Sequence, residues 1–207
     1  MTGGRQPMLK HVILDMGNVL LDYNPRAALD RFFETEEDRS IIQRELFDGP
    51  EWIQGDLGYI TNEQRYDGVS KRVPARLHER LRECVDGWDF CMVPIEGAIP
   101  FCHFVKEQGY GIYVLSNAGL EFYQYFSQYY DPAFFDGIVV SSEVHIVKPD
   151  VGIYRILLEK YGLKAEECLF IDDRQNNVEG ALACGMQAHR FQNDFEILKK
   201  MLGGTQQ

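Results

Sequence analysis

The 207-residue sequence lacks any apolar run that approaches the roughly 20 residues needed to cross a bilayer. Its first ten residues, MTGGRQPMLK, lack the apolar centre of a secretory signal. Positive charge is scarce as well, because 21 lysines and arginines stand against 32 acidic residues, for a formal net charge of −11. Nucleic acids and anionic membranes attract basic surfaces, so this balance argues against both as partners.

Paired cysteine spacing is also missing. Disulfide frameworks and zinc sites use paired cysteines, and disulfides persist in oxidising compartments. The cysteines are odd in number and show no C-x-x-C spacing, at positions 84, 91, 102, 168 and 184. We therefore expect free, buried thiols and a cytoplasmic location.

Short apolar segments of strand length recur along the chain. They occupy residues 11–15, 111–116, 137–142, 168–173 and 186–191. Between them, apolar residues recur with helical periodicity over 96–108, 150–161 and 176–184. Nearly continuous apolar strands that alternate with helices indicate βαβ units. We predict an α/β fold with a doubly wound, Rossmann-like parallel sheet.

The stretch between the first two predicted strands breaks this pattern. From about residue 25 to 94 it contains no convincing strand, and helices are expected at 26–34, 37–48, 61–72 and 75–86. The segment from Thr61 to Gln64 fits a helix-capping box. A single crossover helix needs far fewer residues. We therefore expect a core of residues 1–24 and 93–207 with an all-helical cap, 25–92, inserted after the first strand.

Polar residues gather where the predicted strands end. Ligands of open α/β sheets bind at the carboxyl ends of the strands, so these residues should converge. They are Asp15, Ser116, Asn117, Lys148, Asp172 and Asp173. Three ionised carboxylates need a counter-charge, which Mg²⁺ and Lys148 can supply. A hydroxyl and an amide before a helix expected at 119–129 suit an anion such as phosphate.

In this order, the segments around Asp15, Ser116-Asn117, Lys148-Pro149 and Asp172-Asp173 resemble the four motifs of the haloacid dehalogenase-like superfamily. The resemblance covers roughly residues 10–192, and the inserted helices resemble the C1-type cap of that superfamily. Three segments, DMGNVLLDYNP, GDLGYITNEQ and LSNAG, are similar to sugar-phosphate phosphatases related to α-D-glucose-1-phosphate phosphatase, and to the phosphatase domain of soluble epoxide hydrolase.

The resemblance implies a phosphatase that uses Mg²⁺ as its cofactor. Asp15 is then the nucleophile, which forms an aspartyl-phosphate, and also a metal ligand. The backbone carbonyl of Gly17 and the carboxylate of Asp173 complete the protein ligands. Asp172 supports Asp173 or a bound water, or replaces it as a ligand.

The same resemblance assigns the phosphate site. Ser116, Asn117 and Lys148 are expected to hold the phosphoryl oxygens, and Lys148 also offsets the charge of Asp15. The expected partner is a small phosphorylated metabolite, a sugar phosphate or a similar ester.

Many relatives carry a second aspartate two residues after the nucleophile, where this sequence has Gly17. That aspartate protonates the leaving oxygen and later activates water, and such help is worth about 10²–10⁴-fold in rate. Three hypotheses remain open. The substrate has a good leaving group, as an anomeric sugar phosphate does; or another acid such as Asp22 substitutes; or the chain only binds phosphate ligands. The G-N-V pattern shared with the phosphatases it resembles favours the first.

Two other activities fit the sequence less well. A metal-independent 2-haloacid dehalogenase would leave Asp172-Asp173 as an unexplained charge cluster, and phosphomutases of this superfamily rely on the absent second aspartate. From outside enzymology, a catalytically weak or silent module that binds phosphate ligands or partner proteins stays an alternative, because a fold does not fix a function.

The cap is expected to select the substrate by closing over the site. Its candidate contacts are Trp52, Gln54 and Tyr59, although Trp52 also suits the core of the cap. A dense group of aromatic residues at 123–130 fits either core packing or a dimer face. The sequence therefore leaves both a monomer and a homodimer open.

Overall fold

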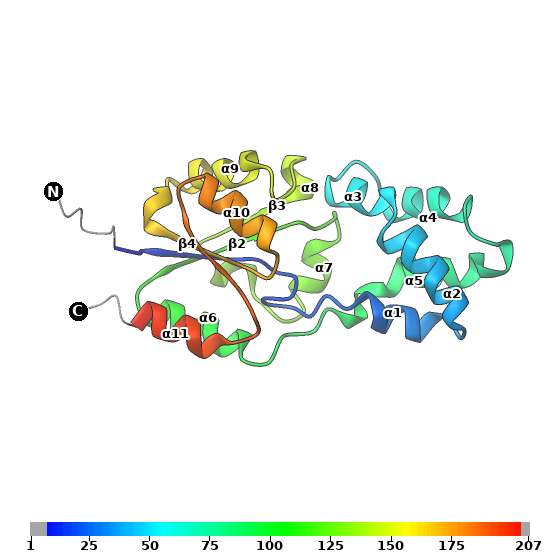
Figure 1. The fold of residues 1–207 in the computed structure, drawn as a ribbon, viewed down its shortest axis with the longest axis horizontal. Helices are drawn as coiled ribbons and strands as arrows, with labels where there is room; N and C mark the ends of the chain where they lie inside the picture. The colour runs from blue at the N-terminus through cyan, green and yellow to red at the C-terminus, as the bar shows by residue number, and fades with distance from the viewer. Residues whose placement is uncertain (1–7, 204–207) are drawn as a thin grey trace.

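The computed structural model describes residues 8–203, so the first seven residues of the N-terminal segment and the tail from 204 to 207 lie outside it. Strands and helices alternate along most of the chain (Figure 1). The strands are β1 (His11–Leu14), β2 (Gly111–Ser116), β3 (Gly137–Val140), β4 (Cys168–Asp172) and β5 (Gln187–Arg190). The helices outside the insertion are α6 (Ala98–Glu107), α7 (Phe122–Phe126), α8 (Ser141–Val144), α9 (Val151–Tyr161), α10 (Gln175–Ala183) and α11 (Phe195–Gly203).

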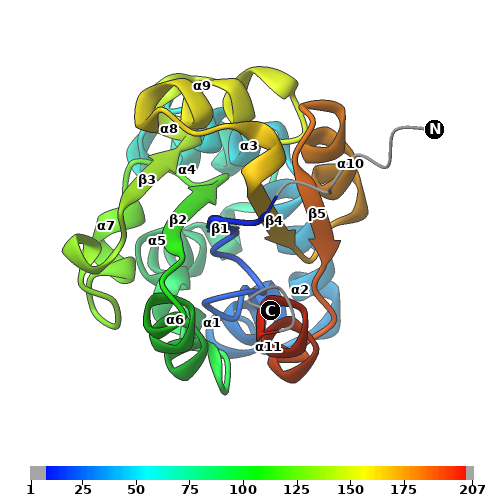
Figure 2. The ribbon, with the colours of Figure 1, turned by 90° about the vertical axis from the view of Figure 1, so that its left-hand side faces the viewer.

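The strands form one parallel sheet in the order β3-β2-β1-β4-β5. Helices α9 and α10 cover one face, and α6 and α11 cover the other (Figure 2). In β1, Val12 and Leu14 pack with the helices of the second face, whereas Ile13 packs with those of the first. All three side chains are fully buried, and burial of each contributes about 1.5–3 kcal/mol. The predicted doubly wound α/β fold is confirmed.

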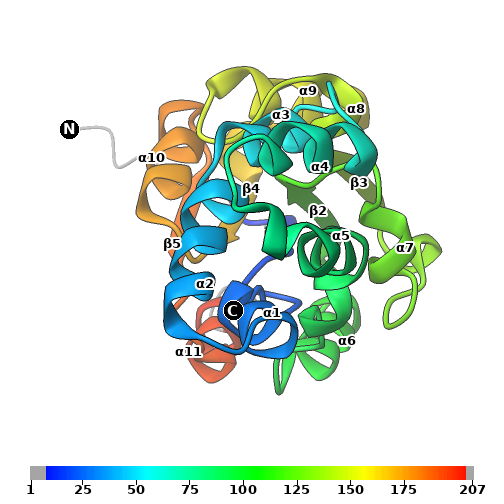
Figure 3. The same ribbon diagram turned by 90° about the vertical axis from the view of Figure 1, so that its right-hand side faces the viewer.

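The segment between β1 and β2 is helical, as predicted, and gathers beyond the carboxyl ends of the strands (Figures 1 and 3). Its α-helices are α1 (Pro25–Phe32), α2 (Glu36–Ile42), α3 (Pro50–Asp56), α4 (Asn62–Ser70) and α5 (His78–Gly87). Shorter turns are the π-helical η1 (Gln43–Phe47) and the 3₁₀ turns η2 (Ala75–Leu77) and η3 (Trp88–Cys91). We refer to this set, residues 25–92, as the inserted helices.

The two chain segments that connect the inserted helices to the sheet run side by side. Asp22 donates its backbone N–H to the carbonyl of Val93 at 2.8 Å, and Ile95 donates to Leu20 at 3.1 Å. A β-bridge between Leu21 and Pro94 lies between these bonds. We propose that this pairing marks the boundary between a core, 1–24 and 93–207, and a cap, 25–92.

The capping box predicted at Thr61 is confirmed. The N–H of Gln64 donates to Thr61 Oγ1 at 3.3 Å, and the N–H of Thr61 donates to Gln64 Oε1 at 2.9 Å. The short helix α3 is absent from the sequence prediction, although Pro50 at its first turn is a common helix start. Its position matters, because it ends beside the candidate site.

Two predicted elements are wrong in extent. The helix expected over 119–129 is only α7, Phe122–Phe126, because its aromatic residues lose side-chain freedom in a helix and Pro132 follows closely. The strand expected over 137–142 ends at Val140, and Ser141 begins α8. Tyr125, Phe126 and Tyr130 are buried and pack in the core, whereas Tyr123 and Tyr129 are exposed, so a dimer face in this aromatic region stays a prediction.

All five cysteines are free, as the sequence predicts, and four of them are buried, whereas Cys184 is only partly buried. Within residues 8–203, no helix combines the length and apolar character of a bilayer-spanning segment.

Candidate active site

Asp15 and Asp172 meet because their strands are neighbours. β1 pairs with β4 in parallel, Leu14 lies opposite Ile171, and each aspartate comes at or just after the end of its strand. The N–H of Asp15 continues the ladder by donating to the carbonyl of Ile171 at 2.9 Å. The pairing register therefore fixes the two carboxylates side by side at the carboxyl edge of the sheet.

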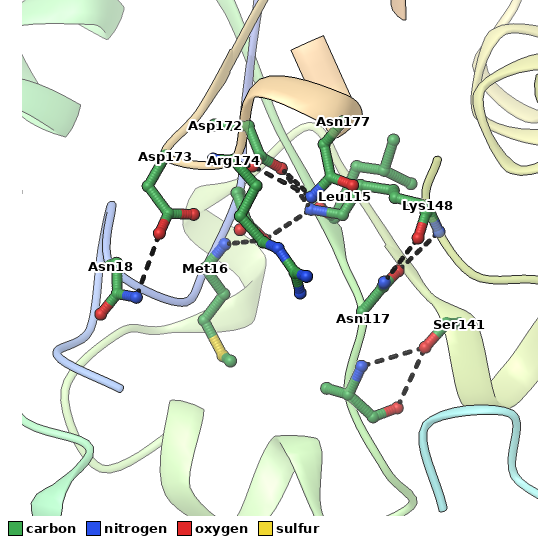
Figure 4. A network of polar contacts seen from close by, with 12 residues as sticks. Met16, Asn18, Leu115, Asn117, Ser141, Lys148, Asp172, Asp173, Arg174 and Asn177 are labelled. Atoms are coloured by element: carbon green, nitrogen blue, oxygen red, sulfur yellow. Dashed lines mark hydrogen bonds and ion pairs between the residues drawn. The ribbon is translucent and has the colours of Figure 1, made fainter. Parts of the chain in front are cut away.

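Lys148 forms ion pairs with both of these carboxylates, and Figure 4 shows its side chain beside that of Asp172. Its Nζ is 2.6 Å from Asp15 Oδ1 and 2.8 Å from Asp172 Oδ2, and it donates to the carbonyl of Leu115 at 2.8 Å. An ammonium has three protons to donate, so these three acceptors satisfy it completely. A buried lysine in this position offsets the negative charge at the site.

Burial and neighbouring charges shift the pKa values of Asp15 and Lys148 in opposite directions. Burial raises the pKa of Asp15, and the positive charge of Lys148 counteracts that rise. Burial alone would lower the pKa of Lys148, but the charges of Asp15 and Asp172 outweigh it and raise that pKa. The lysine therefore stays protonated at neutral pH.

The side chain of Asp172 is fixed by several donors. Asn177 Nδ2 lies 3.0 Å from each carboxylate oxygen, and the N–H of Arg174 donates to Oδ1 at 2.8 Å. With Lys148 on Oδ2, both oxygens of this fully buried carboxylate are engaged. This arrangement favours the supporting role that the resemblance implies for Asp172.

Asp173 is the more available acid of the pair. It is partly buried, and Asn18 Nδ2 donates to its Oδ2 at 3.1 Å. Burial raises the pKa of Asp173, the hydrogen bond from Asn18 lowers it, and the charge of Asp172 raises it further. A cation beside this carboxylate would relieve the repulsion.

The three acids fit a divalent cation. Asp15, Asp172 and Asp173 each offer an oxygen, and these oxygens lie within 4.8 Å of one another. One lysine cannot neutralise three carboxylates, and a hard cation with oxygen ligands such as Mg²⁺ suits the remaining charge. Gly17 lines the cavity beside Asp15, and the role of its carbonyl as a ligand stays a prediction.

The absence of a side chain at Gly17 is not imposed by crowding. A Cβ at this position would have the Cβ of Tyr23 as its nearest neighbour, at 3.7 Å, which is an ordinary contact. The backbone therefore has room for a Cβ at the position where the common motif carries its second aspartate.

The predicted phosphate-binding residues divide into two roles. The Asn117 side chain receives the N–H of Lys148 at 2.8 Å and donates to the carbonyl of Lys148 at 3.0 Å, so it positions the lysine. The hydroxyl of Ser116 is fully buried and has no hydrogen-bond partner among the atoms that the structure describes. Ser116 is not among the described residues that line the cavity, so its role in holding a phosphoryl oxygen stays a prediction from the sequence.

Two residues of the polar network are missing from the sequence prediction. Asn18 adopts a left-handed φ of 56°, which asparagine tolerates better than most residues, and its Oδ1 also accepts the N–H of Tyr23 at 3.0 Å. Asn177 comes from the first turn of α10. The Gly-Asn pair at 17–18 is a turn signal that could have identified Asn18, whereas no local signal marks Asn177.

A cavity of about 600 Å³ opens above these residues. Asp15, Asp173 and Lys148 line its floor, whereas the buried Asp172 is not among the described lining residues, and residues from the inserted helices and their flanks line its walls. Five aromatic residues in the lining form a connected group of rings with centroids 4.9–6.0 Å apart: Tyr23, Phe47, Trp52, Trp88 and Tyr125. We refer to these five residues as the aromatic wall.

Of the cap residues expected to contact substrate, only some line the cavity. Trp52 lines the cavity and also packs on Phe47 and Trp88, so both interpretations of it hold. Within the described part of the chain, Gln54, Tyr59 and Asp22 are not among the residues that line the cavity. The ring of Tyr59 instead stacks on the ring of His145, with 5.3 Å between the ring centroids.

Comparisons with known proteins agree with this architecture. The family model described as haloacid dehalogenase-like hydrolase matches residues 9–185, a span that runs from before β1 to the end of α10. A structure of the HAD family enzyme bt-2542 from Bacteroides thetaiotaomicron, in complex with magnesium and inorganic phosphate, has a TM-score of 0.74 and 21% identity. The match covers 92% of this chain and 98% of that one and shows a shared fold.

Two curated relatives are fungal proteins. The chain is 28% identical over 181 residues to sesquiterpene phosphatase astK of Aspergillus oryzae, covering 86% of this chain and 87% of that protein. It is 24% identical over 198 residues to drimenol cyclase drtB of Aspergillus calidoustus. That match covers 94% of this chain but only 36% of the cyclase.

Proposed function

The chain belongs to the haloacid dehalogenase-like hydrolase family, and on this basis we propose that it is a Mg²⁺-dependent phosphomonoester hydrolase. The observation that carries the proposal is the shared lysine. Lys148 bridges Asp15 and Asp172 at 2.6 and 2.8 Å on the floor of a cavity that Asp173 also lines. One carboxylate is thereby presented to the cavity beside a fixed positive charge and a candidate metal site.

The proposed reaction has two steps. An oxygen of Asp15 attacks phosphorus and forms an aspartyl-phosphate while the alcohol leaves, and water then hydrolyses this intermediate. Lys148 offsets the charge that spreads over the phosphoryl oxygens, and the hydroxyl of Ser116 is free to donate to one of them. Asp15, Asp173 and the carbonyl of Gly17 would hold Mg²⁺. The bound metal would neutralise further phosphoryl oxygens and orient the phosphate.

We propose that the esterified group is apolar, such as an isoprenoid. The aromatic wall faces the cavity next to the phosphate site, and Met92 and Ile53 extend its apolar surface. Large rings favour contact with a hydrocarbon chain because they bury apolar area. The relative named as a sesquiterpene phosphatase supports the same class of substrate. The sequence alone predicts a sugar phosphate, and this substrate is tested beside the apolar ester.

Phosphate release with and without the metal tests the activity. Purified protein is incubated with p-nitrophenyl phosphate in Mg²⁺ and then in EDTA, and we expect release only with Mg²⁺. A panel of farnesyl phosphate and glucose 1-phosphate then ranks the substrate classes by kcat/KM, and we expect farnesyl phosphate to rank higher. If none of these esters is cleaved in Mg²⁺, the alternative of a module that only binds phosphate ligands is favoured.

A further inference from the structure

The proposed reaction needs a proton donor that the first strand does not supply. Gly17 has no side chain, and Asp22 is not among the described residues that line the cavity. Three acids outside the metal cluster do line it: Asp48, Asp56 and Glu121. Asp48 accepts a hydrogen bond from Gln43 at 3.0 Å, and Glu121 forms an ion pair with the buried Arg65 at 3.3 Å.

We propose that Asp56, at the end of α3, is the general acid and base of this enzyme and replaces the aspartate that is missing at position 17. The proposal rests on the phosphatase function proposed above. It places the proton donor on the inserted helices, in the lining of the cavity that the nucleophile also lines.

The backbone around Asp56 is seated firmly on the core. Ser141 Oγ donates to the carbonyl of Asp56 at 2.6 Å and accepts the N–H of Ala118 at 3.0 Å, next to the phosphate site. His145 Nδ1 lies 2.7 Å from the carbonyl of Leu57. Gly58 has a φ of +71°, and a Cβ there would lie 2.2 Å from the carbonyl oxygen of Ser142. These contacts fix the position of Asp56 relative to Asp15, as a general acid requires.

The surroundings of the Asp56 carboxyl suit proton transfer near neutral pH. Burial raises the pKa of Asp56 to about 7, and the charges of Arg65, Arg174 and Lys148 limit the rise while Glu121 adds to it. All four of these charged residues line the same cavity, so the carboxyl senses both the inserted helices and the core. A group with this pKa can hold a proton in one step and accept one in the next.

Asp15 forms a bond to phosphorus, the bond from phosphorus to the ester oxygen breaks, and that oxygen takes the proton of Asp56 to leave as an alcohol. The resulting Asp56 carboxylate then accepts a proton from water as the water oxygen attacks the aspartyl-phosphate. The bond between phosphorus and Asp15 breaks, phosphate leaves, and Asp15 and Asp56 return to their carboxylate and protonated forms.

A series of esters with different leaving groups tests the proposal. In Asp56→Asn, kcat/KM for octyl phosphate should fall by about 10²–10⁴-fold, because an alkoxide leaves poorly without a proton. kcat/KM for p-nitrophenyl phosphate should change little, because nitrophenolate leaves without one. The loss of kcat/KM for phenyl phosphate should be intermediate between these two. Asp22→Asn is the matched control and should show no such dependence on the leaving group.

The wild-type enzyme gives a second readout that does not depend on how the variant folds. For octyl phosphate, kcat/KM should decline as the pH rises through about 7, when Asp56 loses its proton, while p-nitrophenyl phosphate should lack this decline. Equal losses for all three esters in Asp56→Asn, or no loss, would overturn the proposal. So would a basic limb shared by both esters in the wild type. Failure of the wild type to cleave any ester with Mg²⁺ would instead refute the phosphatase function itself.

Discussion

At the scale of single residues, Asn18 joins two parts of the site. Its amide donates to Asp173 at 3.1 Å and accepts the N–H of Tyr23 at 3.0 Å. In Asn18→Gly the left-handed backbone stays unstrained while both hydrogen bonds are lost. We expect the Mg²⁺ concentration for half-maximal activity to rise by about 10–100-fold, as is typical when a partner of a metal ligand is removed.

The matched control is Gly17→Ala, which adds a methyl group with an ordinary contact of 3.7 Å. A metal ligand at this position is a backbone carbonyl, so the Mg²⁺ requirement should stay close to that of the wild type. An unchanged Mg²⁺ dependence in Asn18→Gly would contradict the role given to Asn18.

The sequence predicts the charged residues of the site better than the residues that hydrogen-bond to them or face them. Asp15 and Asp172 could be placed together because they stand at the ends of predicted strands, and Lys148 because it lies in the segment after a third strand; the carboxyl ends of parallel strands share one edge. Asn177 and Asp56 could not, because their roles depend on where α10 and α3 lie in space. Asn117 was placed at the site, but only the structure gives its side chain the Lys148 backbone as a partner.

At the scale of elements, the junction between α3 and α8 controls how the inserted helices meet the core. In Gly58→Ala the new Cβ would lie 2.2 Å from the Ser142 carbonyl oxygen, and the backbone φ of +71° would be strained as well. The segment carrying Asp56 must then move away from the site. We expect a larger loss of kcat/KM for octyl phosphate than for p-nitrophenyl phosphate, measured beside Gly203→Ala, where a Cβ has no neighbour within 4 Å.

Circular dichroism on both glycine variants would verify that helix content is retained. If Gly58→Ala leaves the ratio of kcat/KM for octyl phosphate to kcat/KM for p-nitrophenyl phosphate unchanged, the contacts that hold the end of α3 against the core do not position Asp56.

The elements themselves follow from the sequence where their apolar pattern is long. β2, Gly111–Ser116, was predicted to the residue because all but its first residue are buried, and α9 was predicted within one residue. The errors lie in short elements. α7 and α8 span five and four residues, and their form is set by tertiary packing of Phe122 and Ser141 rather than by local periodicity.

At the scale of the whole molecule, the acid cluster should couple metal binding to stability. Mg²⁺ that binds only the folded chain would stabilise it by about 2.7 kcal/mol at a hundredfold excess over Kd. For a chain of this size that is a rise in Tm of about 5–10 °C. We expect this rise in scanning calorimetry with Mg²⁺ relative to EDTA, and its loss in Asp173→Asn.

The same experiment has an internal check. Asp22→Asn removes a carboxylate outside the cluster and should keep the full shift in Tm. Equal Tm values for the wild type in Mg²⁺ and in EDTA would contradict a metal site at Asp15, Asp172 and Asp173.

The cavity is the feature that the sequence could least predict. Its aromatic wall combines Tyr23, Phe47 and Trp52 with Trp88 and Tyr125, which are distant in the chain and meet only when the inserted helices pack over the sheet. The sequence identified Trp52 but paired it with Gln54 and Tyr59, which do not line the described cavity. The change from a sugar to an apolar ester as the proposed substrate follows from this wall.

In the proposed reaction Asp15 carries the phosphoryl group, and one measurement tests this role most directly. Wild type and Asp15→Asn are mixed with p-nitrophenyl phosphate and Mg²⁺, quenched in acid within the first turnover, digested and analysed by mass spectrometry. We expect a phosphoryl group on Asp15 in the wild type, and neither a phosphoryl group nor turnover in the variant. Phosphorylation of another residue, or wild-type turnover by Asp15→Asn, would contradict the account.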